Sequence, residues 1–62
     1  MKLYEIPDGS KLLIDGQEIR FGHIDGMYSY CTTKDGQVVH FLAWSEWDKK
    51  DGYYEFVDKN TK

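Results

Sequence analysis

Cys31 and His40 are the residues of this sequence whose types could do nucleophilic or metal chemistry. If the chain turns at Asp35-Gly36 through a two-residue loop, the two side chains lie opposite each other on one face of a sheet, with Cβ atoms roughly 4.5–5.5 Å apart. A thiol beside an imidazole base is the minimum of thiol nucleophile chemistry, and it is also half of a zinc site. The sequence shows neither further ligands nor an oxyanion hole. We therefore expect no catalytic residue and no metal site, and interpret Cys31 as a half-buried thiol beside an edge histidine.

A second set of side chains could contact a small ligand. His23 precedes a turn and shares a predicted face with Tyr28, where we expect a hydrogen-bonded histidine at the rim of the fold. Arg20 supplies a cation on the same strand, and Cys31 and His40 complete the set of candidate ligand contacts. No glycine spacing matches a phosphate-binding loop, and the aspartates lack the dense spacing of a calcium loop. We expect no cofactor.

Asp-Gly dipeptides organise the elements that must position these residues. They occur at 8–9, 15–16, 25–26, 35–36 and 51–52. Asp-Gly tolerates the positive φ angles of a type I′ turn, and between alternating segments it is the strongest short-range signal of a β-hairpin. The intervals predict an antiparallel meander. Gly22 lies inside a predicted strand, where a glycine indicates a bulge, a bend or the close approach of another backbone.

The register of each hairpin follows from its turn, because residues that flank a two-residue loop pair and share a face. Centred on the Asp-Gly pairs, the hairpins oppose Leu12 with Ile19, Phe21 with Tyr30, Tyr30 with Phe41, and Trp47 with Phe56. These registers converge on one apolar face. Its predicted members are Leu12, Ile14, Ile19, Phe21, Tyr28, Tyr30, Val39, Phe41, Ala43, Trp47, Tyr54 and Phe56.

The predicted fold is an all-β five-stranded antiparallel meander that curls into a small SH3-like barrel. Curling is expected because a flat sheet of this size could not cover its own apolar face. Residues 2–7 could add a short N-terminal edge strand that ends at Pro7, since proline cannot donate to a strand ladder. The chain of 62 residues is expected to form a single domain, residues 1–62.

The opposite face of the predicted sheet is more apolar than a solvated face should be. Ile24, Met27, Leu42 and Trp44 are expected to cluster there, and contiguous exposed apolar patches mark interaction surfaces. Two interpretations stay open. The terminal segments could fold over this face as a second small core, or the face could bind a partner or a second copy of the chain. Trp44 is then the expected hot spot, because tryptophan is enriched at such positions.

Composition limits the classes of partner. The formal charge is −3 and the cations are dispersed, whereas nucleic-acid binding relies on clustered cations that release counterions. We therefore expect no nucleic acid, and interpret the three Phe, five Tyr and two Trp mainly as core. No apolar run is long enough to span a membrane, and no signal-peptide pattern is present. A lone cysteine favours a reducing compartment, so the expected location is the cytoplasm.

The segments "IPDGSKL", "FGHIDGMYSYC" and "VVHFLAW" resemble small uncharacterised proteins of tailed bacteriophages, over roughly residues 3–47. The resemblance implies expression in the cytoplasm of a bacterial host, as an accessory factor or as a protein that binds and neutralises a host component. It implies no particular activity.

The function expected from the sequence is therefore that of a non-enzymatic binding protein, which acts through the apolar sheet face on a host protein or as a homo-oligomer. Two alternatives stay open. One is an oligomeric protein that sequesters a small ligand or nucleotide in a pocket between subunits. The other is a weak binder of single-stranded nucleic acid through the aromatic face.

Overall fold

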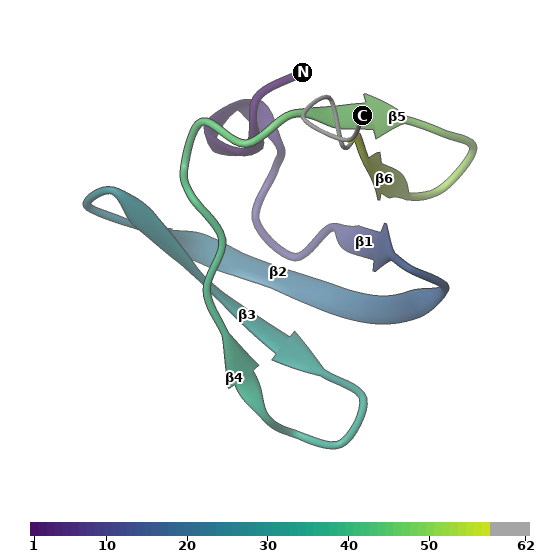
Figure 1. Ribbon diagram of the computed structural model, residues 1–62, viewed down its shortest axis with the longest axis horizontal. Helices are drawn as coiled ribbons and strands as arrows, with labels where there is room; N and C mark the ends of the chain where they lie inside the picture. Colours follow the sequence, from purple (N-terminus) through teal and green to yellow (C-terminus); the bar gives the residue numbers. More distant parts are fainter. Residues whose placement is uncertain (58–62) are drawn as a thin grey trace.

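A computed structural model describes residues 1–57, which form one six-stranded mixed sheet. The elements are a 3₁₀ helix η1 (Leu3–Glu5) and the strands β1 (Lys11–Ile14), β2 (Gln17–Asp25), β3 (Tyr28–Thr33), β4 (Val38–Val39), β5 (Trp47–Lys49) and β6 (Tyr54–Phe56). They lie in the order β4-β3-β2-β1-β6-β5. Figure 1 shows the long β2 across the middle of the molecule, with β3 and β4 on one side and β1, β6 and β5 on the other.

The first and last hairpins have the predicted registers. Leu12 pairs with Ile19 across β1 and β2, and Asp15 and Gly16 both have positive φ, as a type I′ turn requires. Trp47 pairs with Phe56 across β5 and β6. The chain is therefore all-β, as predicted, with these two hairpins built from adjacent segments.

The predicted five-stranded meander and its closure into a barrel are wrong. β6 does not extend the meander from β4 but pairs in parallel with β1, through Leu12 with Tyr54 and Leu13 with Glu55. The outer strands β4 and β5 lie at opposite ends of the sheet order, so the sheet is open. The parallel pairing has no local sequence signal, because its two strands are separated by most of the chain.

The predicted N-terminal edge strand is also wrong. Residues 3–5 form η1, and strand-like pairing in this segment is limited to an isolated bridge between Lys2 and Glu46. The segment lies along the connection from β4 to β5, where the Tyr4 amide donates to the Ala43 carbonyl at 3.0 Å. Leu3 thereby enters the core.

A single core lies on the inner face of the sheet, and this face is covered by the N-terminal segment and by Trp47. The Trp47 ring makes edge contacts with Phe41 and Phe56, with centroid distances of 5.4 and 5.2 Å. Its indole N–H donates to the Ser45 hydroxyl at 2.8 Å. The buried cluster consists of Leu3, Ile6, Leu12, Ile19, Phe21, Cys31 and Trp47.

The hairpin between β2 and β3 differs from the prediction by one position. Asp25 pairs with Tyr28, so the loop residues are Gly26 and Met27. Gly26 has φ of 65° and Met27 does not have positive φ, which matches a type II′ turn with glycine first rather than a type I′ turn with Asp25 first. A further register shift occurs around Gly22, between Phe21 and His23. A Cβ at Gly22 would lie 2.7 Å from the Tyr30 carbonyl oxygen, which agrees with the prediction of an irregularity or a close backbone approach at this glycine.

The hairpin between β3 and β4 is also shifted. The Thr33 amide donates to the Gln37 carbonyl at 2.8 Å, so the loop has three residues and ends in the left-handed Gly36. Cys31 pairs with Val39 instead of His40. A one-residue slip moves a strand's side chains to the opposite face. The shift between β2 and β3 therefore turns the side chains of β3 to the face opposite to the predicted one. The second shift, between β3 and β4, compensates for the first, so that Val39 of β4 is packed on the core as predicted.

Candidate functional site

The predicted pairing of Cys31 with His40 does not exist. The inversion of β3 places Cys31 in the core with 1% of its surface exposed. Its sulfur lies 3.4 Å from the Ser29 hydroxyl. Desolvation by burial raises the pKa of the Cys31 thiol, although the contact with Ser29 and the Gly22 backbone N–H oppose the shift. The thiolate is the reactive species of a cysteine, and a raised pKa disfavours it. The structure thus places Cys31 in the core instead of at the half-buried edge position expected from the sequence.

His40 instead belongs to a cluster of rings on the outer face of the sheet, the face that points away from the core. Its Nδ1 lies 2.8 Å from the Ser29 carbonyl. The Tyr30 ring lies between His40, which it meets edge-on at 4.9 Å, and His23, on which it stacks at 5.2 Å. We call His23, Tyr30 and His40 the ring cluster. It unites two candidate ligand contacts with a tyrosine that the sequence had assigned to the core.

A hollow that we call the aromatic hollow is formed in part by two members of the ring cluster, Tyr30 and His40. It has a volume of about 310 Å³ and is lined by Asp25, Tyr28, Ser29, Tyr30 and His40. Tyr28 and Tyr30 are 51% and 43% exposed, so the prediction that they are core residues is wrong. The hollow thus presents aromatic surfaces together with one carboxylate.

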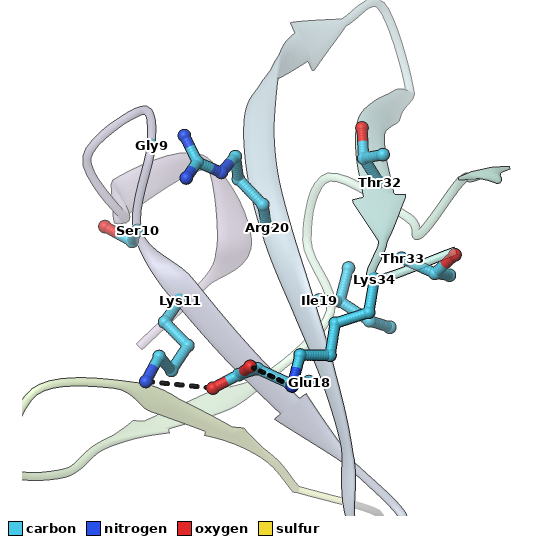
Figure 2. A pocket seen from close by; sticks show the side chains of 9 residues that line it. All are labelled: Gly9, Ser10, Lys11, Glu18, Ile19, Arg20, Thr32, Thr33 and Lys34. Atoms are coloured by element: carbon cyan, nitrogen blue, oxygen red, sulfur yellow. Dashed lines mark ion pairs between the residues drawn. The ribbon is translucent and has the colours of Figure 1, made fainter. Parts of the chain in front are cut away.

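The cationic hollow lies further along the same strands. It has a volume of about 550 Å³, and Figure 2 shows the side chains around it. Arg20 extends at one end, near the Gly9 loop, while Lys11 and Lys34 converge on Glu18 at the other. The lining residues are Gly9, Ser10, Lys11, Glu18, Ile19, Arg20, Thr32, Thr33 and Lys34.

Glu18 bridges the two lysines of this hollow. Its carboxylate oxygens lie 2.9 Å from the Lys11 Nζ and 3.7 Å from the Lys34 Nζ. The hydrogen bond and charge of Lys11 hold the pKa of Glu18 below its ordinary value, with a smaller contribution from Lys34. Within residues 1–57 the Arg20 guanidinium has neither an ion pair nor a hydrogen bond to another side chain. Among the described residues that line this hollow, Arg20 is therefore the cation without an ion-pair partner.

The predicted apolar cluster is only partly assembled. Ile24 is half-buried and packs on the core from the inner face, whereas Met27, Leu42 and Trp44 are exposed. The exposed residues flank Ala43, whose amide donates to the Met27 carbonyl at 2.8 Å and whose carbonyl accepts from Tyr4. We call Tyr4, Met27, Leu42 and Trp44 the apolar patch. The N-terminal segment does not cover the outer face, since its Leu3 and Ile6 join the single core; the C-terminal residues 58–62 lie outside the described residues.

Sequence reasoning missed Tyr30, Asp25, Lys11 and Lys34 as members of these hollows. Lys11 had a signal in the sequence, because the correctly predicted first hairpin already pairs it with Arg20. Lys34 had none, because its face depends on the shifted register of β3. Tyr30 and Asp25 had none, since their placement depends on the shifted turn and on the bulge at Gly22.

The fold and these surfaces define a small all-β domain with a six-stranded open mixed sheet, two hollows on the outer face, and exposed apolar residues around Ala43. Comparison with protein-family models, curated proteins and solved structures gives no match to this chain. Among residues 1–57, no His, Cys, Asp and Glu side chains gather in a group of three that could hold a metal ion. No helix in the same range is long and apolar enough to cross a membrane.

Proposed function

We propose that this protein is a non-enzymatic binding protein that contacts another protein through the apolar patch. The observation that carries the proposal is the exposure of the patch: Met27 is 57% and Trp44 is 48% exposed, although both flank the buried Ala43. Tryptophan and methionine are enriched at protein interfaces. A folded chain gains nothing in stability from leaving them in water.

The architecture of the patch supports a rigid interface rather than a mobile loop. Three separate segments meet at Ala43 and are joined there by backbone hydrogen bonds of 2.8 and 3.0 Å. The turn that follows is held by the Ser45 hydroxyl, which donates to the Leu42 carbonyl at 2.7 Å. An interface presented in a fixed geometry loses less conformational entropy on binding.

The class of partner that we propose rests on the resemblance of the sequence segments to bacteriophage proteins. We propose a soluble protein of the bacterial host, bound in its cytoplasm, rather than a second copy of this chain. Inhibition or recruitment of that protein by binding alone would need no catalytic residue in this domain.

The experiment compares proteins captured from a bacterial lysate by the immobilised wild type and by Trp44→Ala. Val38→Ala is the matched control, because Val38 is also an exposed apolar residue but lies on β4 outside the patch. We expect a host protein that the wild type and the control retain and that Trp44→Ala binds at least tenfold more weakly, as truncation of a hot spot predicts.

Sedimentation of the same variants separates the two kinds of partner. If the wild type is monomeric at the concentration of the capture experiment, the patch is free for a host protein. Self-association that Trp44→Ala abolishes would assign the patch to a homo-oligomer and overturn the proposal. Identical capture by all three proteins would also overturn it.

A further inference from the structure

The two hollows of the outer face are parts of one surface. Paired residues on neighbouring strands share a face, so the outer face carries successive cross-strand rows. One row runs from Lys11 through Arg20 to Thr32. The next is the ring cluster, and the third joins Asp25, Tyr28 and Leu42. From one end to the other, the surface changes from cationic through aromatic to acidic.

The aromatic end suits a planar base. Tyr28 and Tyr30 have about half of their surfaces free, and stacking of a base on such rings is favourable for every base. Tyr30 is held in place by His23 and His40, so it needs little ordering when a ligand binds. Asp25 at the rim can only accept hydrogen bonds when ionised. It therefore favours a ring that carries an amino group.

The cationic end suits phosphate. Arg20 has no side-chain partner in the part of the chain that is described, and its guanidinium can donate two parallel hydrogen bonds to phosphate oxygens. Lys11 and Lys34 add charge near Glu18 at the other end of the hollow. Because both lysines already share this one carboxylate, the end has a formal surplus of positive charge.

The spacing of the rows fits a ligand with a base at one end and phosphates at the other. Outward residues on β3 alternate, and each pair of residues advances the strand by roughly 7 Å. The row of Thr32 and Arg20 is thus one such step from Tyr30, and Lys34 is two steps from it. A single extended nucleotide with more than one phosphate spans this range.

We propose that the outer face of β2, β3 and β4 binds a free nucleoside polyphosphate whose base carries an amino group. The base stacks on Tyr28 and Tyr30 beside Asp25, and the phosphates lie on Arg20, with Lys34 and Lys11 beyond. The site involves one subunit, in contrast to the pocket between subunits expected from the sequence. The proposal does not depend on the apolar patch.

The same chemistry occurs in single-stranded nucleic acid, but the charges favour a free nucleotide. A longer strand would bring further phosphates past the aromatic end to Asp25, and the whole chain carries a formal charge of −3. A single nucleotide presents its anionic groups only where the cations are.

The test is calorimetric titration of the purified full-length protein with ATP, CTP and UTP in EDTA. Adenosine and inorganic tripolyphosphate serve as half-ligands. We expect ATP to bind at least tenfold more tightly than either half-ligand, and ATP and CTP to bind more tightly than UTP, which has a carbonyl in place of the amino group. Amide chemical shifts should change around residues 20 and 28–34.

Variants assign the ends of the site. Tyr30→Leu removes the stacking ring and should weaken ATP binding about fivefold or more, and Arg20→Gln should do so for ATP and tripolyphosphate alike. Asp25→Asn should reduce the preference for ATP over UTP. Lys49→Gln, on β5 at the opposite end of the sheet order, is the control for loss of one positive charge and should leave ATP affinity unchanged. Amide spectra confirm that each variant is folded.

Several results would overturn the proposal. The first is the absence of ATP binding at millimolar concentration. Equal affinities for ATP and tripolyphosphate would reduce the surface to a general anion patch. A single-stranded dodecanucleotide that binds more than tenfold more tightly per site than ATP would assign the face to nucleic acid. Equal losses with Arg20→Gln and Lys49→Gln would show that only net charge matters.

Discussion

The Oγ of Ser29 lies 3.4 Å from the Sγ of Cys31, and both side chains are buried on the inner face of β3. The same hydroxyl donates to the Phe41 carbonyl at 3.2 Å and accepts from the Phe41 amide at 3.1 Å. This buried serine therefore joins β3 to the chain that follows β4, in a region where regular strand pairing has ended.

Ser29→Ala is expected to destabilise the fold by about 1–3 kcal/mol, because it leaves the Phe41 amide without its side-chain acceptor in a partly buried place. Urea unfolding measures the loss. Ser10→Ala is the control, since the Ser10 hydroxyl donates to the Pro7 carbonyl at an exposed turn, and its loss should be smaller. Equal losses for the two variants would contradict a structural role for the buried serine.

The Cys31 thiol is expected to react with a disulfide reagent at pH 8 only as fast as the chain unfolds. Burial raises its pKa, and the reagent cannot reach it in the folded state. Stability should also fall as the pH rises above the ordinary range of a thiol, because the unfolded chain releases this proton first. Cys31→Val should flatten that part of the profile of melting temperature against pH. Fast, stoichiometric labelling of the native protein would contradict the placement of Cys31.

Gly22→Ala is expected to destabilise the protein by about 1–3 kcal/mol through overpacking. A Cβ at this position would lie 2.7 Å from the Tyr30 carbonyl oxygen, which is backbone and cannot swing away. Gln17→Ala, at an exposed position of the same strand, should change stability by less than about 0.5 kcal/mol. If Gly22→Ala were equally neutral in urea unfolding, the close approach at the bulge would be wrong.

Truncation of the two tryptophans should reduce the stability of the fold to very different extents. Trp47 is fully buried, and its replacement by alanine is expected to cost about 3–5 kcal/mol, enough to unfold much of so small a domain. Trp44→Ala should change stability by about 0.5 kcal/mol or less because the side chain is exposed. Iodide should quench the fluorescence of Trp44 in the Trp47→Phe variant, and quench that of Trp47 poorly in Trp44→Phe.

Glu18 is expected to titrate below the ordinary value of a glutamate, because Lys11 lies 2.9 Å from its carboxylate. The ion pair contributes above the ordinary pKa of the group and is lost as the pH falls through the lowered one, so acidification should weaken the fold slightly through this residue. Carbon-detected NMR titration measures the pKa. Lys11→Gln should raise it further than Lys34→Gln does; the reverse order would contradict the geometry of the bridge.

The sequence predicted local pairing well where the turn had only one interpretation. Asp15-Gly16 gave the register of its hairpin, and Asp51-Gly52 gave the pairing of Trp47 with Phe56. At Asp25-Gly26 the prediction was wrong because Gly26 can be the second residue of one turn type or the first of another. The energies of these alternatives depend on packing that is distant in the sequence.

The same ambiguity hid the candidate site. The shifted turn and the bulge at Gly22 act together, so that Tyr28, Tyr30 and His23 all lie outside while Cys31 and Ile24 lie inside. A pattern of alternating residues does not reveal this inversion, because Cys31 and Ser29 are small enough to be buried and tyrosine is tolerated on either face. The parallel pairing of β1 with β6 was likewise beyond any local signal.

That parallel pairing also sets the order in which the molecule can assemble. The hairpins of β1, β2 and β3 close over short loops, whereas the pairing of Leu12 with Tyr54 must wait until almost the whole chain is free. Contacts so distant in sequence slow folding, and β1 meanwhile keeps an unpaired edge that another chain could bind. The sheet is thus completed only after residue 56 has left the ribosome, and a nascent chain that stalls earlier is the species most exposed to misassembly.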